Sequence, residues 1–165
     1  MKKLQQIEKS ALKTALVERL RQDLAVITAA QRASQAGVTH EESRAESDKD
    51  MRATETSYLA RGQAERVVAL REDIAKLAHM ELRSFGAEGA VALSALVLIE
   101  EEGDEEIYFV ASAGGGVRLE VGELVVRVVT PEAPLGRALL GRRVDDVIER
   151  PGPQGLREQT LVELA

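Results

Sequence analysis

Four carboxylates near residue 45 are the side chains with the clearest chemical potential. Glu42 and Glu46 are four residues apart and would share one face of a helix. Glu46, Asp48 and Asp50 follow at steps of two and could instead converge in a loop. Carboxylates bind Mg²⁺ through one or two oxygens, and waters or other ligands must complete the octahedron. We therefore expect this group to hold Mg²⁺ only where a second molecule supplies further ligands, with no metal bound in the free protein.

Other catalytic or cofactor chemistry finds little support in the sequence. The 165-residue chain has no Cys, which excludes disulfides, Cys-ligated zinc, iron–sulfur clusters and thiol catalysis. The two histidines, His40 and His79, lie near opposite ends of one predicted helix and cannot share a metal ion within a chain. Gly114–Gly116 precedes an alternating strand pattern and no Lys follows it, so this glycine run is a turn rather than a phosphate-binding loop. We expect no stably bound cofactor and no enzymatic activity of the chain's own.

The carboxylates fall between two stretches with helical periodicity. Apolar residues recur there at steps of three and four. They are Leu12, Leu16, Leu20, Leu24 and Ile27 in the first stretch, and Val67, Leu70, Ile74 and Leu77 in the second, with Leu59 further upstream. Each stripe is narrow and needs a partner, so we predict an antiparallel coiled-coil hairpin over residues 1–80 with an acidic tip near 40–55. The reversal is expected near 36–40, with Thr39 at the start of the second helix, or alternatively in a turn that extends to about Thr54.

Charge is distributed unevenly along the chain. Residues 1–80 carry 14 basic and 12 acidic side chains, a net of +2, whereas residues 81–165 carry 8 and 16, a net of −8. The segment 41–55 contributes −3, which leaves +5 on the helical stems. The contrast favours two domains. The overall charge of −6 argues against direct binding to a nucleic-acid backbone.

The second half has the pattern of a small sheet with one helix. Strand candidates are 91–100, 107–110, 117–121, 124–129, 144–148 and 161–164. Pro134 suits the first turn of a short helix and Gly141 its end. We predict an α+β protein, in which a linker at 81–90 leads to a domain over 91–165 with four to six strands. The acidic run 100–106 is interpreted as a solvated hairpin end, or alternatively as an acidic contact surface.

Residues 130–148 resemble a known family. The segment Thr130–Arg142, which reads TPEAPLGRALLGR and is followed by Asp145-Asp146-Val147, resembles the C-terminal signature of the Gre-type (GreA/GreB) transcription elongation factors. Residues 53–77 are similar to the descending helix of that family, and residues 161–164 to its final strand. The resemblance implies an N-terminal antiparallel coiled coil and a C-terminal domain of FKBP-like fold.

The same resemblance implies a partner and a role. Family members bind bacterial RNA polymerase through the C-terminal domain and pass the coiled coil into the secondary channel. The corresponding partner-binding residues here are Pro134, Leu135, Gly136, Arg137, Gly141 and Arg142. Tip carboxylates then help the polymerase to hold Mg²⁺ while it cleaves a backtracked transcript. The metal-facing set here is Glu46, Asp48 and Asp50, with Glu42 as the next candidate. We expect a cytoplasmic, bacterial monomer that makes no membrane contact, stimulates the polymerase's own hydrolytic activity and contacts RNA only indirectly.

The tip departs from the family motif. The family has an Asp and a Glu three residues apart, in a motif of the type Gly-Asp-Leu-Lys-Glu-Asn, where this sequence reads ESDKD over residues 46–50. Two alternatives therefore stay open. One is a regulator that occupies the polymerase channel without stimulating cleavage, and the other is a coiled-coil adaptor with no polymerase partner.

Overall fold

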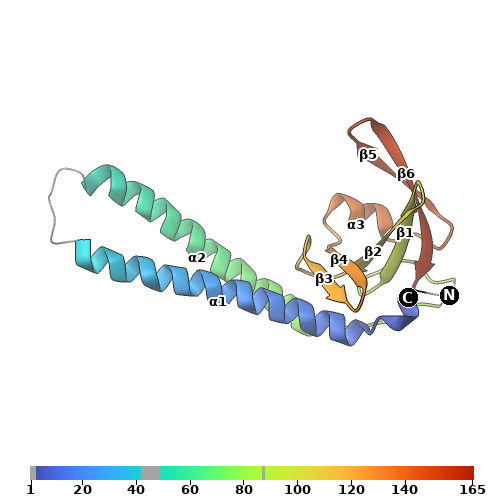
Figure 1. The fold of residues 1–165 in the computed structure, drawn as a ribbon, viewed down its shortest axis with the longest axis horizontal. Coiled ribbons are helices and arrows are strands. Elements are labelled where there is room, and N and C mark those ends of the chain that lie inside the picture. The colour runs from blue at the N-terminus through green and yellow to red at the C-terminus, as the bar shows by residue number, and fades with distance from the viewer. Residues whose placement is uncertain (1–2, 42–48, 87) are drawn as a thin grey trace. The chain divides into compact units, whose positions relative to one another are not determined.

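The computed structural model describes residues 3–41, 49–86 and 88–165 (Figure 1). These residues form two compact units. The hairpin unit is Glu18–Ala75, and the sheet unit combines Met1–Val17 with Lys76–Ala165. The first and last turns of the long helices thus belong to the sheet unit. None of the described helices combines the length and apolar character needed to cross a membrane.

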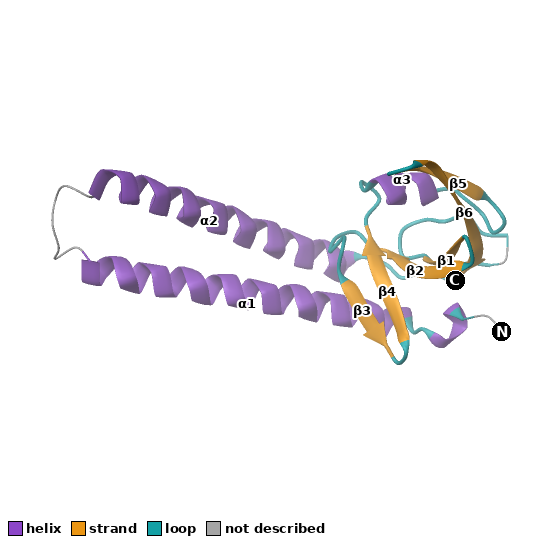
Figure 2. Ribbon diagram, turned by 45° about the horizontal axis from the view of Figure 1, so that its top comes forward, coloured by secondary structure: helices purple, strands orange, loops and turns teal. Residues whose placement is uncertain are grey.

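Two long helices, α1 (Lys9–Glu41) and α2 (Lys49–His79), make up the hairpin. Figures 1 and 2 show them side by side and running in opposite directions, which confirms the predicted hairpin. Leu20, Val67 and Leu70 of the apolar stripes are buried in the hairpin unit. Residues that repeat at steps of three and four share one face of a helix, so these side chains form a narrow seam.

The predicted position of the reversal is wrong. Helix α1 continues through Gly37 and Thr39 to Glu41, so Thr39 does not begin the second helix. Helix α2 begins at Lys49, ahead of Thr54. The physical reason is that a lone interior Gly costs only about 1 kcal/mol relative to Ala, which a run of good helix formers can offset. The connection falls within residues 42–48, outside the described residues.

The sheet unit contains a six-stranded mixed sheet in the order β3-β4-β2-β1-β6-β5. Its strands are β1 (Leu96–Glu101), β2 (Asp104–Val110), β3 (Arg118–Val121), β4 (Leu124–Val129), β5 (Val147–Gly152) and β6 (Gly155–Leu164). Neighbouring strands are antiparallel except β2 and β4, which are parallel with Ile107 opposite Val126. The predicted α+β class and strand number are confirmed.

Some strand boundaries differ from the prediction. The run 91–100 becomes a strand only at Leu96, because buried Ser94 has a left-handed backbone with φ 72°. The backbone of Val91 pairs instead with the segment after the short helix α3 (Pro134–Leu139), through Gly141 and Arg142. Strands β5 and β6 form a longer hairpin than the predicted segments 144–148 and 161–164.

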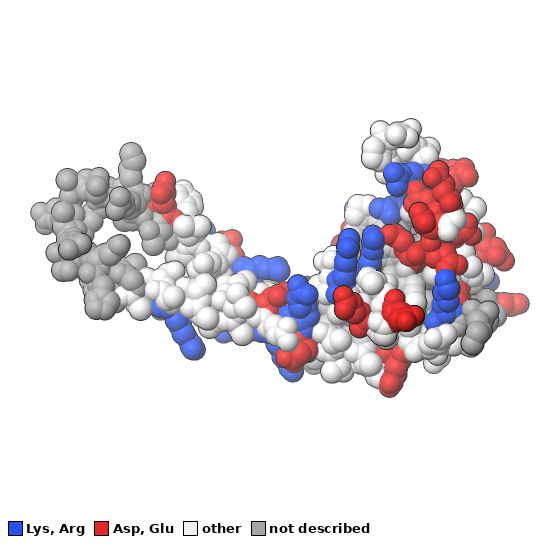
Figure 3. Space-filling model, viewed as in Figure 1, with Lys and Arg blue, Asp and Glu red and all other residues white. Residues whose placement is uncertain are grey.

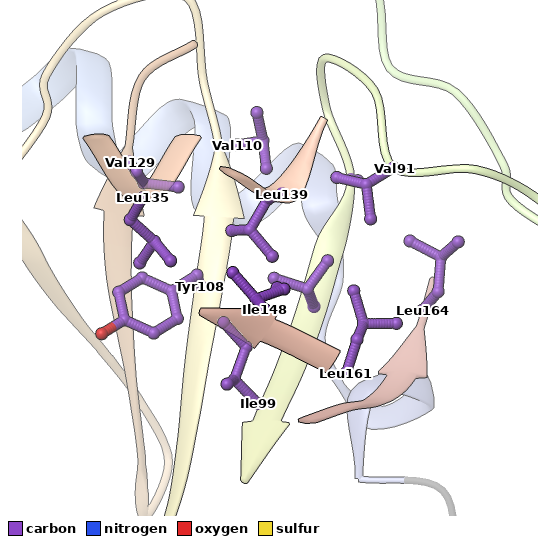
Figure 4. Close-up of a cluster of buried hydrophobic side chains, with 12 residues drawn as sticks. Val91, Ile99, Tyr108, Val110, Val129, Leu135, Leu139, Ile148, Leu161 and Leu164 are labelled. Atoms are coloured by element: carbon purple, nitrogen blue, oxygen red, sulfur yellow. The ribbon is translucent and has the colours of Figure 1, made fainter. Parts of the chain in front are cut away.

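One cluster of the core of the sheet unit lies between a face of the sheet and α3. Figure 4 shows Leu139 of α3 beside Ile148 of β5, and Leu135 of α3 beside Val129 of β4; Leu161 of β6 belongs to the same cluster. Apolar burial contributes about 25 cal/mol per Å² of surface removed from water, so this cluster stabilises the unit. Pro134 occupies the first turn of α3, and Gly141 follows the helix with φ 79°. The predicted boundaries of the short helix are therefore confirmed.

The base of α1 is tied to the chain that follows α2. Lys13 Nζ donates to the carbonyl oxygens of Ala78 at 3.1 Å and Met80 at 2.8 Å. A cation at this position satisfies carbonyls that a helix end leaves unpaired and complements the helix dipole. Lys9 Nζ lies 4.6 Å from the centre of the Phe85 ring, and burial lowers the pKa of this amine.

Candidate functional site

The predicted metal-facing tip cannot be placed. Glu42, Glu46 and Asp48 lie outside the described residues. Asp50 falls in the first turn of α2, but its side chain is also outside the description. Among the described residues, no group of three or more His, Asp or Glu side chains is arranged to hold a metal ion. The role of the tip carboxylates stays a prediction.

The predicted partner-binding residues all lie on or beside α3. Pro134, Arg137, Gly141 and Arg142 are exposed. Leu135 and Gly136 are buried beneath them. The exposed members form one side of the helix and its C-terminal turn, where Arg142 Nε donates to the Ala138 carbonyl at 3.3 Å. Only the exposed members can meet a partner directly; the buried two hold the helix in place.

Gly136 explains why α3 can lie so close to the strand that precedes it. A Cβ atom at this position would lie 1.9 Å from the Thr130 carbonyl oxygen, far inside van der Waals distance. Thr130 O also accepts a hydrogen bond from Ala133 N, at 3.1 Å, so this carbonyl is fixed by the turn. Only Gly fits between this turn and α3. The glycine therefore sets the position from which Arg137 projects.

The exposed side of α3 is basic with a small apolar component. Arg137 is exposed on the helix, Arg142 is exposed in the turn that follows it, and Leu140 is 38% exposed. Arginine presents five donors in a planar fork that matches carboxylates. This surface can bind a protein face with acidic and apolar groups.

A second feature of the sheet unit is a polar cleft of about 1060 Å³ between the β1–β2 turn, β4 and the β5–β6 hairpin. Two ion pairs lie inside it. Arg127 Nη2 is 2.8 Å from Glu106 Oε1, and Arg157 Nη1 is 3.2 Å from Glu101 Oε1. Figure 3 shows acidic side chains gathered at this end of the sheet unit. We call this feature the polar cleft.

Tyr108 joins the core to the polar cleft. Its ring packs in the apolar cluster, and Figure 4 shows the hydroxyl pointing away from the other apolar side chains. The hydroxyl donates to Glu106 Oε2. Burial of the ring and this bond to a carboxylate both raise the pKa of Tyr108 above 10.0. The phenol thus stays protonated and holds Glu106 at the margin of the core.

Sequence reasoning found only part of the polar cleft. The acidic run 100–106 is predicted to be a hairpin end or an acidic contact surface. In the structure Glu102 and Gly103 form the β1–β2 turn, and both have positive φ. The opposite wall, from Arg150 to Gln159, was not expected to be a hairpin. A usable signal was the spacing of Pro151-Gly152 and Gly155 around a two-residue loop.

No protein-family model matches the sequence, and no curated protein matches it. Among solved structures, the chain is similar to GreA factor homolog 1 (Gfh1) of Thermus thermophilus, at 24% identity and a TM-score of 0.39 over 90% of this chain and 94% of that one. It is similar to Thermus aquaticus Gfh1 at 23% identity and a TM-score of 0.40, over 89% and 92% of the two chains. A third similar structure is the elongation factor GreA/GreB from Nitrosomonas europaea, at 22% identity and a TM-score of 0.38 over 58% and 78%. These solved structures are of the Gre type, the family whose C-terminal signature residues 130–148 resemble.

Proposed function

We propose that the chain is a bacterial RNA polymerase-binding factor of Gre type that acts in transcription elongation. In this proposal the exposed side of α3 docks on the polymerase, and the helical hairpin enters the secondary channel. The tip carboxylates then supply ligands to the polymerase Mg²⁺ site and stimulate cleavage of a backtracked transcript. The chain acts as a cytoplasmic monomer, is no enzyme by itself and binds no metal stably outside the complex.

The observation that carries the proposal is how the signature segment is built. Residues 130–142 resemble the Gre-type signature, and they form one tightly packed element whose exposed members are Pro134, Arg137, Gly141 and Arg142. Gly136 and the buried Leu135 fix this element from below. Arg137 on α3 and Arg142 in the turn that follows it are thus held at fixed positions where a partner can reach them.

The length of the hairpin also supports the proposal. Helix α1 has 33 residues and α2 has 31, so each rises about 45–50 Å at 1.5 Å per residue. A helix of this length can carry its end deep into a narrow channel. Few apolar side chains are needed along such a pair, which agrees with four aromatic residues in the whole chain.

The proposed role of the tip is to provide carboxylate ligands to a Mg²⁺ ion in the polymerase active site. In a two-metal hydrolysis, one cation activates the attacking water and the other stabilises the leaving oxygen. Glu46, Asp48 and Asp50, with Glu42 as the next candidate, would complete the coordination of the second Mg²⁺. The polymerase supplies the remaining ligands and the RNA, so the factor contacts the transcript only through the shared active site.

Two assays test the proposal in sequence. Core polymerase immobilised at low salt should retain the wild-type chain, and Arg137→Ala/Arg142→Ala should reduce retention severalfold. Backtracked elongation complexes should release shortened RNA when the wild type is added. The variant Glu46→Ala/Asp48→Ala/Asp50→Ala should lose that stimulation and still bind. Cleavage by the triple variant at the wild-type rate would refute the role of these carboxylates.

A second candidate function is a regulator that occupies the channel without stimulating cleavage. The departure at the tip favours it, because ESDKD replaces the family's Asp and Glu three residues apart. The same assay separates the two functions, since such a regulator would slow RNA synthesis and yield no shortened transcripts. No retention on core polymerase at low salt would instead indicate a coiled-coil adaptor with another partner.

A further inference from the structure

The polar cleft continues the same face of the sheet that forms the core. Ile99, Glu101, Asp104, Glu106 and Tyr108 alternate along β1 and β2, so their side chains share one face. At the α3 end this face is apolar, and at the β1–β2 turn it is acidic. Glu101 lies directly opposite Asp104 in the strand register. Like charges directly opposite one another are destabilising, so the fold gains nothing from this pair by itself.

The charges that line the polar cleft do not balance. Glu101 and Glu106 are neutralised by their ion pairs with Arg157 and Arg127. The remaining charged lining residues are three exposed carboxylates and one half-buried guanidinium. They are Glu102, Asp104, Glu158 and Arg150. The cleft therefore keeps a net charge of −2, at its rim.

Independently of the charges, the side chain of Gln159 carries a buried hydrogen-bond acceptor without a partner. Its side chain lines the polar cleft and is 4% exposed. Its amide nitrogen donates to Glu101 Oε2, and its amide oxygen is buried without a hydrogen-bond partner. Turning the amide over would set two oxygens against each other, so the bond to Glu101 fixes the orientation. An unsatisfied buried acceptor costs about 1–3 kcal/mol, and a ligand that brings an N–H donor would recover part of it.

We propose that the polar cleft binds an arginine side chain in a basic, extended segment of a partner protein. A guanidinium brings five N–H donors, enough to meet the carboxylates of Glu102 and Asp104 at the rim and the amide oxygen of Gln159 below. Leu156, which is 70% exposed at the edge of the cleft, offers apolar surface for the aliphatic stem. Because the Gln159 oxygen is buried, its engagement requires side chains of the β5–β6 hairpin to shift.

Arginine suits this site better than lysine. An ammonium is compact and strongly hydrated, whereas a guanidinium is planar, loses less hydration and can bind a carboxylate through two parallel bonds. The exposed pair between Arg157 and Glu101 is worth at most about 1 kcal/mol, so an incoming arginine can replace Arg157 there. The surface is separate from the α3 residues of the proposed function, and the inference stands whether or not the partner is a polymerase.

The test uses the full ¹⁵N-labelled chain and three peptides that differ at two positions. The peptides are acetyl-Gly-Arg-Ser-Arg-Gly-amide and its counterparts with citrulline or lysine in place of arginine. Citrulline has the same shape without the charge. The arginine peptide should shift amide resonances of residues 101–106 and 155–159, the lysine peptide should bind several times more weakly, and the citrulline peptide should not bind.

Matched variants locate the interaction. Glu102→Gln/Asp104→Asn/Glu158→Gln changes exposed rim residues and should weaken binding of the arginine peptide at least fivefold. The control Glu88→Gln/Glu120→Gln/Glu123→Gln removes the same charge from exposed positions outside the cleft and should leave binding within twofold. Gln159→Met, which removes the amide oxygen, should also weaken binding.

Three results would overturn the proposal. They are the absence of shifts at the cleft with the arginine peptide, equal binding of the citrulline peptide, and an equal loss of affinity in the control variant. The last would mean that only the net charge of the chain attracts the peptide. If the Gln159→Met variant is folded, as judged by its amide spectrum, and binds the arginine peptide like the wild type, the buried amide oxygen takes no part in binding.

Discussion

The sheet unit buries most of its large apolar side chains, whereas the hairpin unit leaves several of them exposed to solvent. In the sheet unit, Leu139 and Leu161 are fully buried in a continuous cluster with α3. In the hairpin unit, Val26, Tyr58 and Leu59 are each about 70% exposed. Most helical stability in proteins comes from packing of an apolar face, and these long helices bury only a narrow seam. Stability is therefore concentrated in the sheet unit, and the hairpin is held by its base.

The largest expected difference concerns two leucines. Leu139→Ala should destabilise the sheet unit by about 2–5 kcal/mol, because it removes buried methylenes and leaves a cavity in a closed core. Leu59→Ala should change stability by about 0.5 kcal/mol or less, because the side chain is 69% exposed. Urea unfolding followed by circular dichroism measures both. Equal losses would mean that the exposed side of the hairpin is covered in solution.

Two glycines should respond with opposite signs. Gly136→Ala should destabilise the chain by about 1–3 kcal/mol, because the new Cβ overlaps the Thr130 carbonyl oxygen. Gly62→Ala should stabilise α2 by about 0.5–1 kcal/mol, because no atom lies within 4 Å of the new Cβ and Ala is the better helix former. Thermal unfolding of the two variants gives the comparison. A stable Gly136→Ala variant would show that α3 can move away from residue 130.

The base of the hairpin can be compared with its exposed length. Lys13→Met should cost about 1–2 kcal/mol, because the carbonyls of Ala78 and Met80 lose a charged donor. Arg61→Met removes an exposed pair with Glu65, 3.5 Å away, and should cost about 0.5 kcal/mol or less. Amide hydrogen exchange should also show faster opening of residues 76–80 in Lys13→Met. Similar exchange in both variants would argue against the lysine clamp.

The smallest expected effect is the titration of Tyr108. In a Tyr58→Phe background Tyr108 is the one remaining tyrosine, and its absorbance midpoint at 295 nm should lie above pH 10.0, in agreement with its raised pKa. The unfolded chain releases this proton first. The contribution to stability is therefore fully present below pH 10 and is lost as pH rises through the folded-state pKa. A midpoint at or below 10.0 would contradict the bond to Glu106.

Local signals predicted much of this fold. The spacing of Leu12 and Leu16 indicated the buried face of α1, and Pro134 and Gly141 marked the ends of α3. These features depend on neighbours within a few residues, so periodicity and capping preferences are enough to find them. The reversal was misplaced because Gly37 is also tolerated inside a helix, and a single sequence cannot separate the two cases.

Long-range pairing was beyond local signals. The parallel pairing of β2 with β4 depends on contacts between residues that are distant in the sequence. For the same reason the polar cleft could not be predicted, since Gln159 and Glu101 are 58 residues apart and meet only in the folded sheet. The tip carboxylates were identified from residue type and spacing, and their role stays a prediction.

The division of the sheet unit along the chain has a consequence for how the protein folds. Residues 1–17 belong to the same compact unit as residues 76–165, so the unit cannot be completed until a segment of 58 residues between them has been bridged. For a flexible loop, closure entropy rises with length and slows folding. That segment consists mostly of two helices, which form from local contacts within about a microsecond and shorten the length of chain that must be closed. The hairpin would thus act as a folding aid, and residues 18–75 should be among the first to acquire structure in refolding.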